Sequence, residues 1–179
     1  MGKLVVGPGV VRGNPFVFDA VQAVVETLPY DYVVISWLRP GSITTSGNVS
    51  NHSKGNALDV RPVGYKFVGP SPCGGNKLDA ESQRRNDLLA GALGRMGDRG
   101  TDEPVLWETC TGGNHYDHVH VAVLPGANVK APVGGLISAG ARAAGTAGGM
   151  VGALEGIAGV LSIALLVMLA LGLGLFLIG

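Results

Sequence analysis

The sequence predicts an α+β fold: a small, mainly antiparallel sheet with helices packed on one side, followed by a Gly/Ala-rich tether and a C-terminal transmembrane-type helix. Two segments carry apolar residues at helical spacing, and several short segments are rich in β-branched and aromatic residues. The composition shifts to Gly, Ala and Ser after residue 125. We therefore expect a domain at 1–125, a linker at 126–156 and a membrane-spanning helix at 157–178.

Two helices are predicted within the first part of the chain. The first covers 14–28, because Asn14 can cap it and Pro15 suits the first helical position. The second follows the capping residue Asp79 and continues to about Met96. The predicted apolar faces are Phe16, Ala20, Val21, Val24, Val25 and Leu28 in the first helix, and Leu88, Leu89, Ala92, Leu93 and Met96 in the second.

Four strands are predicted from short runs of β-branched and aromatic residues, at 31–38, 57–63, 104–110 and 116–124. The stretch 64–77 is rich in Gly and Pro, so we expect a loop or lid there. The resulting order is helix, two strands, helix, two strands. This order is typical of an α+β domain with a small sheet.

The segment 157–178 contains 22 residues without a charge. A helix of that length spans about 33 Å, enough to cross the hydrocarbon layer of a bilayer. We expect it to insert into a lipid bilayer, and the alternative is a buried hydrophobic helix in a large assembly. The linker before it is expected to be flexible in water, or to pack closely against other helices within a membrane.

The net charge and the N-terminal residues indicate two features that are not expected in this protein. Thirteen basic residues balance thirteen acidic ones, so no basic surface for nucleic acid is expected. The apolar run at the N-terminus is short and broken by Gly and Pro, so a secretion signal is not expected either.

The two cysteines, Cys73 and Cys110, each lie beside a Gly-Gly pair and form no Cys-x-x-Cys motif. A cysteine zinc site is therefore not expected. Two interpretations stay open. The cysteines form a disulfide that pins two active-site loops in an oxidising compartment, or they are free thiols.

All four histidines of the chain lie in two short polar clusters, 50–59 and 115–120. We expect His52, Asp59 and His120 to bind one Zn²⁺ ion. Two imidazoles and one carboxylate suit a zinc site whose fourth position stays free for water. The alternative is three independent surface or capping residues.

These clusters also carry a resemblance to a known family. The pattern Ser-x-His-x-x-Gly-x-Ala-x-Asp resembles the first motif of the D-alanyl-D-alanine carboxypeptidase type of zinc peptidase. This type belongs to the lysostaphin, D-Ala-D-Ala peptidase and hedgehog group, whose second motif is His-x-His. The resemblance covers roughly residues 30–124 and implies hydrolysis of bacterial cell-wall peptides. The matching residues are Ser50, His52, Gly55, Ala57 and Asp59 for the first motif, and His118 and His120 for the second.

The resemblance implies roles for further residues. In the carboxypeptidase branch an acidic residue three positions before the last ligand is the base, which points to Asp117. In the wider group the first histidine of His-x-His is catalytic, which points to His118. Strand alternation favours His118, and both residues are retained as catalytic candidates. Arg39, Ser50 and His115 are expected to bind substrate.

The function predicted from these features is zinc-dependent hydrolysis of peptidoglycan stem peptides or cross-bridges. Similar domains occur in phage lysins and in virion or tail proteins that open the wall. We therefore expect a membrane-anchored or virion-associated enzyme acting outside the cytoplasm, with other virion or tail proteins as partners. Two alternatives stay open: a non-catalytic wall-binding or structural virion protein, and a holin-like protein whose tail perturbs membranes.

Overall fold

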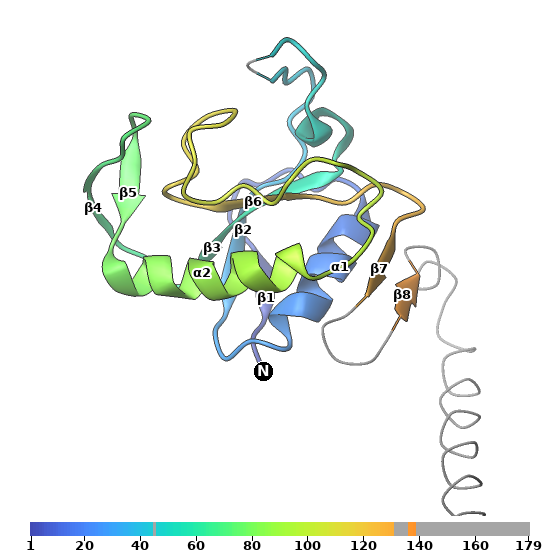
Figure 1. The fold of residues 1–179 in the computed structure, drawn as a ribbon, viewed down its shortest axis with the longest axis horizontal. Helices are drawn as coiled ribbons and strands as arrows, with labels where there is room; N and C mark the ends of the chain where they lie inside the picture. Colours follow the sequence, from blue (N-terminus) through green and yellow to red (C-terminus); the bar gives the residue numbers. More distant parts are fainter. Residues whose placement is uncertain (45, 131–135, 139–179) are drawn as a thin grey trace, which may run out of the picture. The chain divides into compact units, whose positions relative to one another are not determined.

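The structure is a computed structural model that describes residues 1–44, 46–130 and 136–138. It shows a mixed α+β fold with a small sheet and two α-helices among these residues (Figure 1). In chain order the elements are β1 (Leu4–Val6), α1 (Pro15–Val25), β2 (Tyr32–Ser36), the 3₁₀ helix η1 (Asn51–Lys54), β3 (Ala57–Pro62), β4 (Phe67–Pro70), β5 (Asn76–Leu78), α2 (Ala80–Gly94), β6 (Val119–Ala122), β7 (Asn128–Lys130) and β8 (Leu136–Ser138).

The main sheet has the strand order β1-β2-β3-β6. Strand β1 runs parallel to β2, whereas the β2–β3 and β3–β6 pairings are antiparallel. The strands predicted around β2, β3 and β6 are confirmed with shorter bounds. Strand β1 was not predicted, because three residues are too few to show a strand pattern before their partner is known.

Both predicted helices are confirmed, and each begins where its start signal stands. Pro15 is the first residue of α1, although the Asn14 side chain makes no capping hydrogen bond. Asp79 caps α2 by accepting a hydrogen bond from the Ser82 backbone N–H at 2.8 Å. The predicted apolar stripe of α2 is wrong at Leu88, which is 41% exposed, and its other members are buried.

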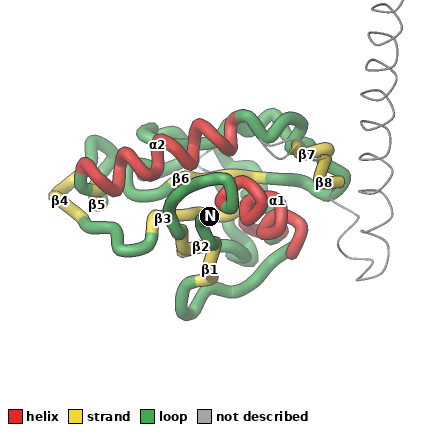
Figure 2. Tube along the Cα trace, turned by 90° about the horizontal axis from the view of Figure 1, so that it is seen from below, coloured by secondary structure: helices red, strands yellow, loops and turns green. Residues whose placement is uncertain are grey.

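The two helices and one face of the sheet share a hydrophobic core, and Figure 2 shows α1 and α2 on that side. Leu58 of β3 and Val119 and Val121 of β6 belong to this core. Side chains alternate along a strand, so Asp59 and His120 point to the opposite face. The sheet therefore separates the core from the two polar strand residues of the predicted metal site.

Residues 104–110 do not form the predicted strand. Within this segment only Leu106 makes a bridge, to His120, and Glu108 has a φ of 51° in the left-handed region. That conformation interrupts an extended path and ends the pairing. The stretch 64–77, predicted as a loop, contains the short hairpin of β4 and β5.

Part of the segment predicted as a linker packs with the rest of the fold. Strand β7 pairs with β8, and Val129 of β7 is buried in the core. The rest of that segment and the hydrophobic stretch 157–178 lie outside the described residues. In the part of the chain that the structure describes, no helix has both the length and the apolar character needed to cross a bilayer.

Candidate metal centre

Three separate elements bring the predicted ligands together. His52 lies in η1, Asp59 in β3 and His120 in β6. The register of the antiparallel β3–β6 pair places Asp59 directly opposite His120. Two of the three ligands are therefore fixed by sheet pairing alone, and the third depends on how the chain before β3 returns to the sheet.

That return requires two glycines. Gly55 ends η1 with a φ of +71°, a conformation that other residues adopt only with strain. A Cβ on Gly13 would lie 2.5 Å from the Gly55 Cα, so the chain before α1 packs directly on this turn. The Asn14 backbone N–H also donates to the Gly55 carbonyl at 3.1 Å. These contacts hold η1 over the sheet and bury His52 completely.

The ligand atoms of the three side chains converge. Asp59 Oδ1 lies 3.0 Å from His52 Nε2 and 2.8 Å from His120 Nδ1. The two imidazole nitrogens are 3.2 Å apart. All three residues are buried, and their ligand atoms lie within 4.8 Å of one another, so the group can hold a metal ion.

Backbone contacts fix the orientation of His52. Its Nδ1 lies 2.7 Å from the carbonyl oxygen of Trp37, so this nitrogen carries the proton and donates. Its Nε2 then faces Asp59 and His120, at 3.0 Å from Asp59 Oδ1 and 3.2 Å from His120 Nδ1. Such a partner on the second ring nitrogen is the usual way in which a protein orients a histidine ligand.

Glu103 is the partner of the second ring nitrogen of His120, and it was not among the residues predicted for the site. Its Oε1 lies 3.2 Å from His120 Nε2, and its Oε2 accepts a hydrogen bond from the Asn51 side chain at 2.5 Å. Glu103 therefore connects β6 to the residue just before His52. It lies in a loop and belongs to no spaced motif, so no sequence signal points to it.

The charges of the group are strongly coupled. Burial opposes ionisation of Asp59, but hydrogen bonds from His120 and His52 outweigh it and hold the pKa of Asp59 well below its usual range. Burial also disfavours the charged form of His120, but Asp59 and Glu103 raise the pKa of His120 to about 9. Without a metal ion, the buried carboxylate is therefore balanced by a protonated imidazole. A cation bound here would replace that proton.

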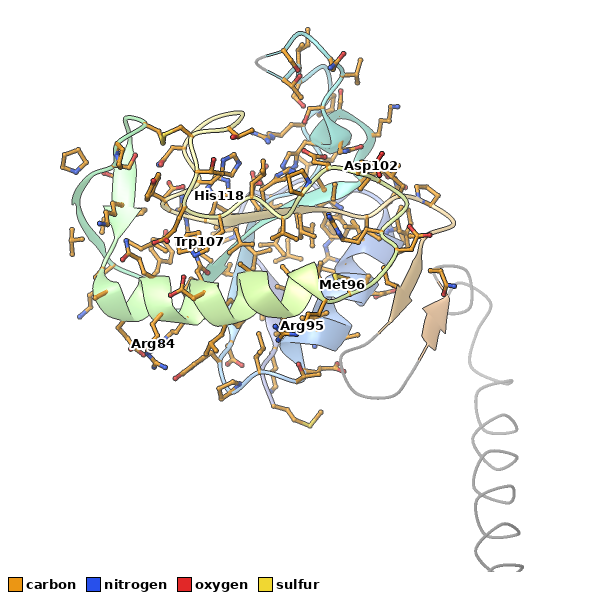
Figure 3. The ribbon with its side chains drawn as sticks, viewed as in Figure 1. Arg84, Arg95, Met96, Asp102, Trp107 and His118 are labelled. Carbon is orange, nitrogen blue, oxygen red and sulfur yellow. A yellow bond between two sulfur atoms is a disulfide. The ribbon has the colours of Figure 1, made fainter. Side chains whose placement is uncertain are left out.

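The two catalytic candidates take different positions. His118 Nε2 lies 3.5 Å from Asp59 Oδ1, on the side of β6 away from α2 (Figure 3). Its other nitrogen, Nδ1, lies 2.5 Å from Asp117 Oδ1. Asp117 does not belong to the convergent ligand group and is held by Arg61, whose NH2 group lies 2.7 Å from Asp117 Oδ2. The structure thus places His118 beside the ligands and Asp117 behind it.

A cleft of about 250 Å³ opens next to the ligands and contains all three predicted substrate-binding residues in its lining. Arg39 is half exposed, with its NH2 group 3.5 Å from Asp59 Oδ2. The Ser50 hydroxyl accepts a hydrogen bond from the His52 backbone N–H at 3.2 Å, so it also supports the ligand.

The His115 ring is buried against His118, with the ring centroids 4.9 Å apart. Burial and the neighbouring imidazoles lower the pKa of His115 to about 4, so it is neutral at pH 7.

One wall of the cleft is covalently fixed. Cys73 and Cys110 form a disulfide, with their Cα atoms 5.4 Å apart. This bond joins the β4–β5 hairpin to the loop before β6, and Figure 1 shows the two segments side by side. That loop contributes Gly112, Gly113 and Asn114 to the cleft lining. Of the two open interpretations of the cysteines, the structure shows the disulfide.

Comparisons with protein-family models, with curated proteins and with solved structures found no match to this chain. The resemblance to the zinc peptidase group therefore stays a prediction. What the structure supports of it is the convergent His52, Asp59 and His120 group.

Proposed function

We propose that this chain is a zinc-dependent peptidase that hydrolyses peptidoglycan stem peptides or cross-bridges. The observation that carries the proposal is the convergence of two imidazoles and one carboxylate beside a fourth polar side chain, His118, at an open cleft. Three protein ligands with an accessible cleft are typical of a catalytic site, whereas structural zinc sites close around four protein ligands.

Zinc fits the donor set better than magnesium or calcium, which prefer sites built from oxygen ligands. When bound here, zinc would lower the pKa of a coordinated water to about 7 and would polarise a carbonyl group. The second partners of the two histidines, the Trp37 carbonyl and Glu103, are of the kind that orient zinc ligands.

His118 is the proposed proton acceptor. Its Nδ1 is held by the Asp117 carboxylate, which keeps the proton on Nδ1 and leaves a lone pair on Nε2. Because Nε2 faces the ligand group, it can take a proton from the attacking nucleophile and later give it to the leaving amine. Asp117 is then the residue that orients and stabilises the charged imidazole.

The cleft lining suits a peptide with a free carboxylate. The Arg39 guanidinium is half exposed at the cleft, so it can bind an anionic group of the substrate. His115 and the backbone of Gly112 and Gly113 offer neutral hydrogen-bonding groups along the same wall. We propose a cell-wall peptide as substrate because the two sequence motifs resemble those of the zinc peptidase group. The proposed membrane-anchored or virion-associated action rests on the same resemblance.

The test uses the full chain, purified with zinc and detergent, and incubated with bacterial cell-wall sacculi. We expect release of new amino termini that stops with a chelator and returns with added zinc. The His118→Gln variant should bind zinc and lose the activity, whereas Asp102→Asn, a change at an exposed position, should keep both. Binding of sacculi without new amino termini would instead support a non-catalytic wall-binding protein. A wild-type chain that binds no zinc would contradict the proposal.

A further inference from the structure

We infer that Arg61 is a positioning residue that fixes the catalytic orientation of His118 through Asp117. The inference deepens the proposed function and rests on it. Arg61 lies two residues after Asp59 on β3, so the two side chains emerge on the same face of the sheet. The resemblance to the peptidase group assigns no role to this arginine.

Arg61 contacts both the backbone and the side chain of Asp117. Its Nε donates to the Asp117 carbonyl oxygen at 2.6 Å, and its NH2 group donates to Asp117 Oδ2 at 2.7 Å. Both side chains are about 15% exposed, so solvent screens this pair only weakly. Two contacts from one planar group fix the position and the rotamer of Asp117 together.

Asp117 uses its two carboxylate oxygens for different partners. Oδ2 receives Arg61, and Oδ1 receives Nδ1 of His118. The direction in which Asp117 presents Oδ1 is therefore set by the bond that Arg61 makes to Oδ2. This direction in turn keeps His118 Nε2 facing Asp59.

Two aromatic side chains hold the guanidinium itself. The Arg61 guanidinium carbon lies 5.0 Å from the centroid of the Tyr65 ring and 5.1 Å from that of Phe67. Both distances lie within the range of a cation–π contact. An arginine fixed in this way loses little further freedom when it binds Asp117, which favours a well-defined geometry over a loose ion pair.

The alternative is that Arg61 only ties β3 to the chain before β6 and stabilises the fold. The two roles differ in what they change. A structural role affects stability and leaves the folded site unaltered. A positioning role changes the tautomer of His118 and the turnover rate without changing metal binding, because the hydrogen bonds of Arg61 go to Asp117 and Tyr65 and not to the three ligands.

The experiment compares Arg61→Met and Arg61→Lys with wild type and with Arg85→Met. Arg85 is a matched control, because it pairs with Glu81 at 2.9 Å and stacks on Tyr30 at 4.7 Å, but lies on α2. Lysine keeps the charge of Arg61 but cannot span both of its contacts to Asp117. The readouts are kcat and KM on a cell-wall peptide, zinc affinity, and the nitrogen chemical shifts of His118 by NMR.

For Arg61→Met we expect kcat to fall about 10- to 100-fold, a part of what a general base contributes, with KM and zinc affinity changed less than about threefold. The NMR spectrum should show His118 protonated on Nδ1 in wild type and as a mixture of tautomers in the variant. Arg61→Lys should change kcat and the His118 tautomer in the same direction as Arg61→Met, but to a smaller extent. This variant keeps the test available if Arg61→Met does not fold. An unchanged His118 tautomer, or a fall in kcat no larger than in Arg85→Met, would overturn the inference. If wild type shows no hydrolysis, the proposed function fails, and the NMR readout still decides whether Arg61 positions His118.

Discussion

Replacement of Asp59 by asparagine removes the only negative charge among the three ligands and preserves the size of the side chain. Asp59 is 4% exposed and lies between His52 and His120, at 3.0 Å and 2.8 Å from their ligand nitrogens. Because these atoms are so close, a divalent ion held by them lies less than about 4 Å from the carboxylate. Two unit charges at that distance attract each other by about 4 kcal/mol at an effective dielectric constant of about 20, and because the ion is divalent this value is a lower bound.

A loss of at least about 4 kcal/mol weakens zinc binding roughly 1,000-fold or more. The change is measurable as thermal stabilisation by zinc. At a zinc concentration 100 times the wild-type Kd, binding stabilises the folded state by about 2.7 kcal/mol, which raises the Tm of a chain of this size by about 8 °C. The same concentration should leave the Tm of Asp59→Asn unchanged within about 1 °C, because the variant is then mostly unbound.

Asp117→Asn is the matched control, since it makes the same chemical change at a neighbouring carboxylate outside the ligand group. It should keep the zinc-dependent rise in Tm. The reasoning is refuted if Asp59→Asn binds zinc within tenfold of wild type, or if Asp117→Asn loses zinc to the same degree.

Four further outcomes are expected. Glu103→Gln should weaken zinc binding about 10- to 100-fold by calorimetry, because the carboxylate orients His120 from its second nitrogen. Zinc affinity should rise about tenfold per pH unit from pH 6.5 toward 9, because the metal must displace the proton of His120, whose pKa is raised to about 9. Binding heats measured by calorimetry in two buffers of different ionisation enthalpy would reveal the released proton. Leu93→Ala, at a fully buried position, should lower the free energy of unfolding by about 2–5 kcal/mol in urea titrations, whereas Leu88→Ala, at a 41% exposed position, should change it by less than about 0.5 kcal/mol. Reduction of the disulfide, whose cysteines are 37 residues apart, should lower the same free energy by about 4 kcal/mol in the chain-entropy description, and a value near zero would contradict that description.

The helices were the most predictable part of the fold, because each combines a start signal with apolar residues at helical spacing. Pro15 and Asp79 mark the two beginnings, and both were identified in the sequence. The apolar stripe of α2 was less accurate. Leu88 fits the helical period as well as Leu89 does, and only the direction of the packing surface decides which of the two is buried.

Strands were harder to predict, because their existence depends on partners far away in the chain. The segment 104–110 has a suitable composition, but only Leu106 finds a partner before Glu108 turns the chain. Strand β1 has three residues and is defined by its parallel pairing with β2. Neither outcome can be read from local composition.

The ligands of the candidate site could be predicted, since the histidines of the chain are confined to two clusters. The groups that hold these ligands in place could not be predicted. The partner of His52 is the backbone carbonyl of Trp37, which any residue would supply, and Glu103 reaches His120 from a loop without a motif. Arg61 had a weak signal, because alternation along β3 places it on the face of Asp59, but nothing in the sequence indicates that it binds Asp117.

The bond between Cys73 and Cys110 has a practical consequence for anyone who prepares this protein. A reducing bacterial cytosol would deliver the chain with two thiols, and air oxidation during purification would convert an uncontrolled share of it. Specific activities from different batches would then vary with the fraction of oxidised molecules as well as with zinc content. Thiol titration of every preparation would separate these two sources of variation.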